Sequence, residues 1–173
     1  NDEGVALIGR GRRLQIDLQV LIPDDHESMG VVVPWSNRRF QYTKKDNCLR
    51  VRGTFRVDGR EFTLHPEGDT YAVHDRGRGK WPYFTLWNWA AGSGTVDGHE
   101  IGLQFGGKWT DDTPSTENWI RIDGRLTKIS EHLEWRYDPN NWMAPWELRG
   151  RDVELTLDPY KHDHHVFNRL VVL

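Results

Sequence analysis

Acidic residues lie close to tryptophans at several places in the sequence, and such pairs could transfer protons. Glu117 precedes Trp119 in "TENW", Asp111 follows Trp109 in "KWTD", and Asp75 lies in "HDRGRG". A carboxyl group held against apolar surface loses hydration, which raises its pKa and suits it to general acid catalysis. We predict that Glu117, with Asp111 or Asp75 as a second carboxylate, carries out acid/base catalysis.

Tryptophan is frequent around these acids. The chain has nine Trp among its 173 residues, and "KWPYFTLWNWAAGSG" contains three of them. An indole ring offers a large, flat apolar surface, so several rings near polar groups favour a pocket for a small molecule. The tryptophans predicted to line this pocket are Trp81, Trp87, Trp89, Trp109 and Trp119.

Polar side chains accompany these rings and could orient a ligand. We predict this role for Lys108, Arg121 and Gln104, because the predicted register places them on the same strand faces as the tryptophans. Lys128 lies near Glu117 in the predicted register and could hold its carboxylate ionised, which favours a role as nucleophile or base. An alternative is that the indole rings pack under a loop, with lysine stems lying over them.

Three functions would use almost the same residues. Paired carboxylates between Trp walls are common in glycoside hydrolases, where one acid protonates the leaving oxygen, and this is the most concrete prediction. A protonated acid in an aromatic cage could instead protonate an alkene and stabilise the carbocation, as a hydratase or isomerase of a terpenoid-like molecule requires. A non-catalytic, lipocalin-like binding protein is the third alternative. All three predict a small-molecule or carbohydrate ligand and no cofactor.

Three Asp-Gly pairs predict the elements that hold these residues. They stand in similar frames, "FRVDGREF", "GTVDGHEI" and "IRIDGRLT". Asp-Gly between alternating residues is a strong hairpin signal, because both turn positions need positive φ. No stretch has a convincing helical period. The sequence therefore predicts an all-β fold, an antiparallel lipocalin-like β-barrel or barrel half built from Asp-Gly hairpins.

A two-residue turn fixes the register of a hairpin, so the faces of its strands can be assigned. In the second and third hairpins one face is aliphatic, and the other carries Trp together with Glu, Gln, Lys and Arg. An exposed sheet face seldom uses Trp, and a sealed core seldom uses charged residues. This mixed face is therefore predicted to line a wet cavity. The residues predicted on the largely aliphatic face are Ile101, Leu103, Phe105, Ile120, Ile122 and Ile129.

The composition favours one domain spanning residues 1–173. The net charge is −3, and the mixed charges give no footprint for nucleic acid or an anionic membrane surface. No apolar run is long enough to span a membrane, and the start "NDEG" is not a signal peptide. The single cysteine, Cys48, is predicted to be a buried structural thiol. Localisation stays open, with the cytoplasm favoured.

Longer stretches resemble a known family. "VPWSNRRFQYTKKDNCL", "DRGRGKWPYFTLWNWAAGSG", "GLQFGGKWTDDTPSTENWIRIDGRLTKI" and "WMAPW" are similar to an uncharacterised, mainly bacterial and fungal family, a domain of unknown function. That family is distantly similar to lipocalin-like, two-barrel proteins that include carotenoid hydratases. The resemblance covers about Val32 to Asp158. It implies β-barrel halves around a small-molecule cavity, with Trp35, Arg39 and Tyr42 as cavity residues.

The resemblance also bears on assembly. The relatives are longer, so the chain is expected to be a fragment, a natural half-protein or one barrel that covers its strand edges in a homo-oligomer. "HDHH", residues 162–165, could place two imidazoles on one strand face, but other ligands of known metal motifs are missing. No metal site is predicted. Gly106 and Gly107 are predicted to mark a bulge or a close backbone approach.

Overall fold

A computed structural model describes residues 4–165 of the chain. The chain forms two compact units, whose described parts are residues 4–131 and residues 132–165. Within residues 4–165 every assigned element is a β-strand, and every strand pair is antiparallel. The all-β, antiparallel part of the fold prediction is confirmed. The single-domain organisation of residues 1–173 stays a prediction.

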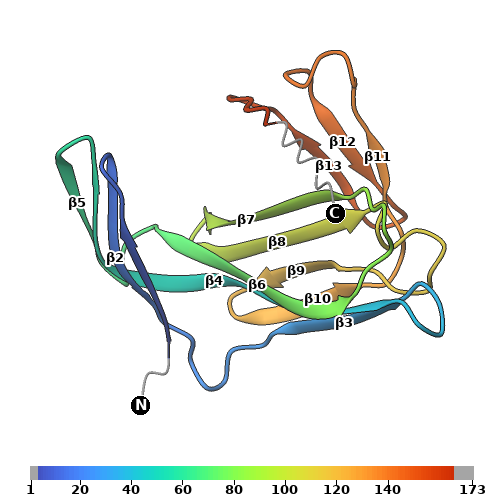
Figure 1. Ribbon diagram of the computed structural model, residues 1–173, viewed down its shortest axis with the longest axis horizontal. Helices are drawn as coiled ribbons and strands as arrows, with labels where there is room; N and C mark the ends of the chain where they lie inside the picture. Colours follow the sequence, from blue (N-terminus) through green and yellow to red (C-terminus); the bar gives the residue numbers. More distant parts are fainter. Residues whose placement is uncertain (1–3, 166–173) are drawn as a thin grey trace, which may run out of the picture. The chain divides into compact units, whose positions relative to one another are not determined.

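The first unit contains two sheets, of six and four strands (Figure 1). The longest strand, β4, holds the larger sheet together, because β2 and β5 pair with its second half and β3 and β6 pair with its first half. The strands of the larger sheet are β1 (Val5–Arg10), β2 (Leu14–Val20), β3 (Met29–Pro34), β4 (Phe40–Val57), β5 (Arg60–Leu64) and β6 (Tyr71–Lys80). Those of the smaller sheet are β7 (Asn88–Val96), β8 (His99–Gly107), β9 (Asn118–Ile122) and β10 (Arg125–Ile129).

The three predicted hairpins are confirmed as β4–β5, β7–β8 and β9–β10. Both residues of every Asp-Gly pair have positive φ, as the tight turn requires. The registers follow from these turns, so the face assignments made for the strands also hold. The turn residues are Asp58 (48°) and Gly59 (85°), Asp97 (51°) and Gly98 (82°), and Asp123 (47°) and Gly124 (83°).

A β-bulge divides β4 between its two sets of partners. The register with β6 shifts between Asp46 and Leu49, and Cys48 takes a left-handed φ of 55°. The extra residue bends the strand and lets it serve both halves of the sheet. Cys48 is buried, as predicted, and burial raises the pKa of its thiol. The thiol is therefore a poor nucleophile at neutral pH.

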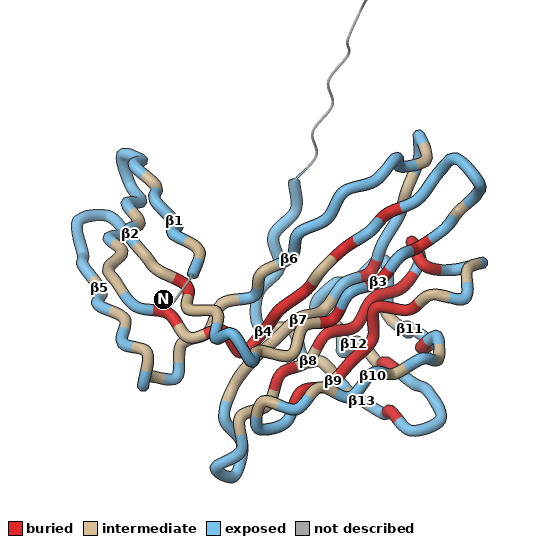
Figure 2. Tube along the Cα trace, turned by 90° about the horizontal axis from the view of Figure 1, so that it is seen from below, coloured by how far each residue is buried: buried red, intermediate tan, exposed pale blue. Residues whose placement is uncertain are grey.

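The first unit has two buried clusters, one of Val20, Leu49 and Val51 on β2 and β4, and one between β3 and the smaller sheet. Met29, Val31 and Val33 of β3 form one cluster with Trp109 and Trp119. The buried stretches of β4, β8 and β9 are red in Figure 2. The mixed face of the smaller sheet is thus the buried one, while the aliphatic face is more open, with Ile122 49% exposed.

The second unit is a three-stranded sheet with its own aromatic cluster. Its strands are β11 (Glu134–Arg136), β12 (Trp146–Arg149) and β13 (Glu154–Leu157). The Tyr137 and Trp146 rings stack with centroids 4.4 Å apart, and Leu148 in the central strand is completely buried. Cross-strand and aromatic contacts of this kind stabilise a small sheet.

The predicted lipocalin-like barrel is not confirmed. The strands of residues 4–165 fall into three separate hydrogen-bonded sheets, and they do not close into one ring. The hairpins were predictable from local turn residues, whereas closure depends on pairing between distant strands.

Candidate functional site

The first unit contains a pocket of about 310 Å³ with four tryptophans at its wall. We call it the Trp pocket. It brings together Glu117 and Asp75, two of the three predicted catalytic residues. The residues that line it are Gln41, Thr43, Lys45, Asp75, Trp81, Trp87, Trp89, Trp109 and Glu117.

Strand alternation explains the floor of the Trp pocket. Gln41, Thr43 and Lys45 are two residues apart on β4, so their side chains share one face. Opposite them on β6 stand Gly79, Gly77 and Asp75, in that order. A Cβ at either glycine would collide with Gln41, so glycine leaves room for this side chain.

The indole rings form a connected wall. The Trp81 ring stacks on Trp109 with centroids 5.8 Å apart, contacts Trp87 at 6.3 Å and meets Trp35 at 5.1 Å. Two indole N–H groups donate hydrogen bonds that fix their rings, Trp81 to Gln41 Oε1 at 2.7 Å and Trp35 to the Trp109 carbonyl at 2.7 Å. The rings are therefore held in place before any ligand arrives.

One lysine joins the two carboxylates. Lys45 Nζ lies 2.5 Å from Asp75 Oδ2 and 2.9 Å from Glu117 Oε2. These two oxygens are therefore at most 5.4 Å apart, the sum of the two distances. The side chains of Lys45 and Glu117 are only 5% and 1% exposed, whereas Asp75 is 41% exposed. Asp75 is the carboxylate that an entering molecule meets.

Glu117 is enclosed by donors. Trp109 Nε1 donates a short hydrogen bond to Oε1, and Gln104 Nε2 donates to Oε2 at 3.4 Å. Burial raises the pKa of Glu117, and the attraction of Lys45 and the hydrogen bonds oppose this increase. A Cβ on Gly106 would overlap the Glu117 carboxylate, so the predicted close backbone approach is confirmed there.

Asp75 is also fixed by a hydroxyl group. Thr43 Oγ1 donates to Asp75 Oδ1 at 2.8 Å, on the side away from the oxygen that contacts Lys45. Both oxygens of Asp75 are thus oriented by side chains of β4. The Lys45 ammonium also lies over the Trp89 ring, 5.4 Å from its centroid.

Several predicted site residues lie near the Trp pocket without lining it. Gln104 contacts Glu117, and Trp35 packs behind Trp81 and Trp109. Arg39 donates a short hydrogen bond from its guanidinium to the carbonyl of Trp81.

Three predicted residues lie elsewhere in the first unit. Asp111 accepts a hydrogen bond from the Lys108 backbone N–H at 3.0 Å, so both belong to the turn after β8. The Lys108 side chain is exposed, and Tyr42 lies on the face of β4 opposite to Gln41 and Thr43.

Trp119 does not reach the Trp pocket either, because it is completely buried in the core with β3. Residues of the β9–β10 hairpin were assigned to one face correctly. Only part of that face lines the pocket: Glu117 does, whereas Trp119 is covered by β3.

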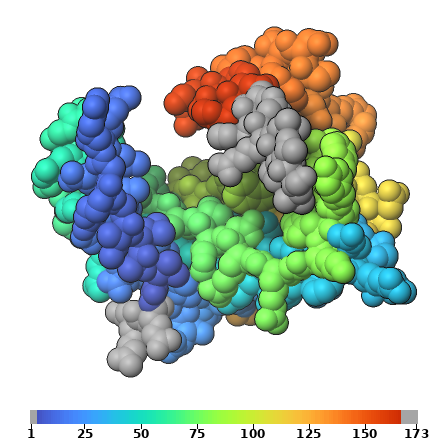
Figure 3. All heavy atoms as spheres, viewed as in Figure 1, coloured from blue at the N-terminus to red at the C-terminus, as the bar shows by residue number. Residues whose placement is uncertain are grey.

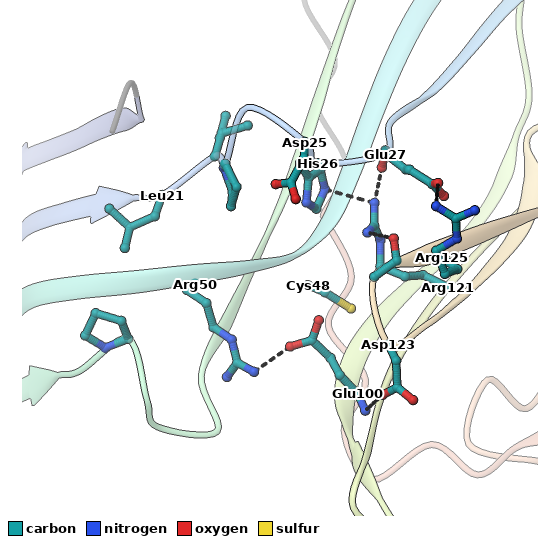
Figure 4. A pocket seen from close by; sticks show the side chains of 14 residues that line it. Leu21, Asp25, His26, Glu27, Cys48, Arg50, Glu100, Arg121, Asp123 and Arg125 are labelled. Atoms are coloured by element: carbon teal, nitrogen blue, oxygen red, sulfur yellow. Dashed lines mark hydrogen bonds and ion pairs between the residues drawn. The ribbon is translucent and has the colours of Figure 1, made fainter. Parts of the chain in front are cut away.

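Arg121 lies in a second hollow of about 490 Å³ (Figure 4). Its guanidinium donates to the Gly124 carbonyl at 2.7 Å and contacts His26 Nε2 at 3.1 Å. The other arginines there are paired too, Arg50 with Glu100 at 2.5 Å and Arg125 with Glu27 at 3.0 Å. The Trp pocket is the better candidate site, because it brings together two of the predicted catalytic carboxylates and four indole rings, whereas Arg121 is the predicted site residue in the second hollow.

Sequence reasoning missed three polar residues of the pocket, Gln41, Thr43 and Lys45. Their alternation on β4 was visible, but only pairing with β6 brings Lys45 to Asp75. Lys45, and not Lys128, is the cation that pairs with Glu117, and the Lys128 ammonium instead donates to the Thr116 carbonyl at 2.8 Å. Burial lowers the pKa of Lys128 to about 8.

No group of three His, Cys, Asp or Glu side chains within residues 4–165 could hold a metal ion. The His162 ring lies beside Trp142, with centroids 6.4 Å apart. In the same part of the chain no helix is long and apolar enough to cross a membrane.

Comparison with known proteins gives a family and no activity. The family model described as "Domain of unknown function (DUF2804)" matches residues 4–173. No curated protein and no solved structure matches the chain. The predicted resemblance to an uncharacterised family is confirmed, and the similarity to lipocalin-like proteins is not.

Proposed function

This chain belongs to the DUF2804 family, and we propose from its Trp pocket that it is an acid/base enzyme that hydrolyses a glycosidic bond of a small, carbohydrate-like molecule. One observation carries the proposal. Two carboxylates in different environments lie within 5.4 Å of each other, oxygen to oxygen, beside a wall of indole rings.

The spacing of the carboxylates favours a retaining reaction. Retaining glycosidases hold their two carboxyl groups about 5–5.5 Å apart, and inverting enzymes hold them about 6.5–9.5 Å apart to admit a water molecule. The upper limit for Asp75 and Glu117 lies in the shorter class. Their environments also differ, since one is buried and the other is open to the pocket.

These environments suggest a role for each carboxylate. Glu117, whose pKa is raised by burial, would give its proton to the leaving oxygen. Asp75, next to the Lys45 ammonium, would attack the anomeric carbon and form a glycosyl ester as the glycosidic bond breaks. Glu117 would then take a proton from water, whose oxygen attacks the anomeric carbon and releases the sugar and the Asp75 carboxylate. The indole rings would stack on the C–H faces of the sugar.

A panel of chromogenic glycosides tests this proposal. We expect turnover with retention of the anomeric configuration, and a loss of at least about 100-fold in kcat/KM for Asp75→Asn and for Glu117→Gln. Asp111→Asn is the matched control, because Asp111 lies in a turn outside the pocket, and it should keep full activity. A 2-fluoro glycoside should leave a covalent adduct on the peptide that contains Asp75. Undiminished turnover in both pocket variants would contradict the proposed reaction.

A second function, ligand binding without chemistry, is favoured by one observation. Both oxygens of Glu117 already accept hydrogen bonds, and Lys45 lies between the carboxylates. Glu117 has to release Lys45 before it can protonate a substrate. If the chain only binds, a sugar or an apolar ligand should quench its Trp fluorescence, and the ligand should be recovered unchanged. Quenching by terpenoid-like molecules alone would favour the hydratase alternative. Both the binding and the hydratase alternatives include the proposal of a lipocalin-like barrel around the ligand.

A further inference from the structure

The side of β4 and β6 that faces away from the Trp pocket has an unusual composition. Arg76, Arg78 and Lys80 alternate with the pocket-side residues of β6, so all three point to this other side. They pair across the sheet with Lys44, Tyr42 and Phe40 of β4. We call this surface the outer face, and it comprises Val32, Phe40, Tyr42, Lys44, Arg76, Arg78 and Lys80.

The apolar members of the outer face are open to solvent. Val32, Phe40 and Tyr42 are 52%, 44% and 39% exposed. They come from neighbouring strands, since Val32 of β3 pairs with Tyr42 of β4. Exposed aliphatic and aromatic side chains on adjacent strands form a continuous patch, which soluble surfaces usually avoid unless it contacts something.

The aromatic loop, residues 81–87, lies at one end of this patch. It begins where β6 ends, and Arg39 in the turn before β4 donates to the Trp81 carbonyl, so loop and turn lie at the same end of the sheet. Tyr83 and Phe84 are 106% and 81% exposed, and Leu86 is 58% exposed. In Figure 3 the light green atoms of this segment lie at the surface beside the cyan turn.

The charge of the outer face is positive. Arg76, Arg78 and Lys80 are exposed, and within residues 4–165 none of them forms an ion pair with an acid. The acidic residue that shares this side of β4 is Asp46, which is completely buried. Arg38 and Arg39 add positive charge at the turn, and the loop after β8, which Trp35 of this turn contacts through the Trp109 carbonyl, carries Asp111 and Asp112.

We propose that the outer face and the aromatic loop dock onto the surface of an anionic lipid bilayer, independently of the proposed function. The mixed charges of the whole sequence give no footprint for such a surface, and it is the pairing of β4 with β6 that gathers the cations on one face. Cationic side chains are attracted to anionic headgroups, and Trp and Tyr favour the interface between headgroups and acyl chains. Exposed Val32 and Leu86 gain little from a polar partner but gain by contact with acyl chains. The same loop supplies Trp81 and Trp87 to the pocket, which would bring the site close to the lipid surface.

Sedimentation with lipid vesicles tests the docking. The full chain should sediment with vesicles that mix phosphatidylcholine and phosphatidylserine, remain mostly free with phosphatidylcholine alone, and dissociate at high salt. Replacing Arg76, Arg78 and Lys80 together by Gln should weaken binding on the order of 100-fold, at about fivefold for each charge. Replacing Tyr83 and Phe84 together by Ser should weaken it by about 10-fold or more.

Matched controls use exposed residues outside this surface. Ile8→Ser with Tyr160→Ser removes two apolar side chains that are 69% and 97% exposed. Arg12, Arg52 and Arg60, each changed to Gln, remove three exposed charges from the part of the larger sheet formed by β1, β2, β4 and β5, and within residues 4–165 none of them forms an ion pair with an acid. Both control variants should bind as the wild type does. All substitutions lie on exposed side chains, so folding should be preserved, and circular dichroism checks this.

Three results would overturn the proposal. The first is equal binding to both kinds of vesicle or to neither. The second is loss of binding in the control variants to the same extent as in the test variants. The third is occupation of this surface by another macromolecule. This would be seen as a dimer that dissociates when Tyr83 and Phe84 are both changed to Ser, or as binding of single-stranded nucleic acid in place of lipid. Glycosidase assays are not needed, so failure here leaves the proposed function untouched.

Discussion

The two carboxylates of the Trp pocket share a single ammonium group. Lys45 contacts both Asp75 and Glu117, and without it two negative charges within 5.4 Å of each other would have no cation between them. Removing one partner of a buried ion pair leaves an uncompensated charge, which typically costs about 3–5 kcal/mol. Lys45 is therefore a positioning residue, which allows Glu117 to be buried while Asp75 stays open to the pocket.

The raised pKa of Glu117 predicts a particular pH dependence of folding stability. Because the native pKa exceeds the unfolded value, the native state holds the proton more tightly, and stability from this group is present below the unfolded pKa. That stability is lost as the pH rises through the native pKa, at about 1.4 kcal/mol for each pH unit of the window. Glu117→Gln cannot titrate, so wild type should lose stability relative to this variant as the pH rises.

Urea unfolding of both proteins between about pH 4 and pH 8 measures this difference. The loss of the Lys45 contact in Glu117→Gln changes the difference in unfolding free energy between the two proteins at every pH. The slope of this difference against pH is therefore the informative quantity. A difference that is flat or grows in favour of wild type with rising pH would show that Glu117 has no raised pKa.

Strand β8 can pass the buried carboxylate only because it has glycine at position 106. A Cβ there would overlap Glu117, whereas a Cβ on Gly92 of the neighbouring strand β7 meets no atom within 4 Å. Gly106→Ala should therefore destabilise the protein by about 1–3 kcal/mol through overpacking, and it should weaken ligand binding because Glu117 moves. Gly92→Ala is the control and should be close to neutral. Thermal unfolding and Trp quenching measure the two effects, and equal stability of both variants would contradict this account.

The strands were predictable where the signal is local. Each Asp-Gly turn fixes a hairpin within a few residues, so the three hairpins and the side of Trp89, Gln104 and Glu117 followed from the sequence. The meeting of Lys45 with Asp75 depends on pairing between β4 and β6, which are joined by a longer connection with no such turn. Trp119 was assigned to the pocket because nothing in its own hairpin indicates that β3 packs over it. Packing between distant strands was thus the part that the sequence pattern did not contain.

At the scale of the whole molecule, the two compact units have separate buried residues. Val33 and Trp119 are fully buried in the first unit, and Leu148 is fully buried in the second. Leu148→Ala should destabilise the second unit by about 2–5 kcal/mol, because it removes buried apolar atoms and leaves a cavity. Leu155→Ala, at the half-buried cross-strand partner of Leu148, should have a smaller effect. Hydrogen exchange read by mass spectrometry should then accelerate in β11, β12 and β13 while β8 and β9 keep their protection. If β8 and β9 accelerated equally, the two units would unfold as one, and the single domain predicted from the composition would be the better description.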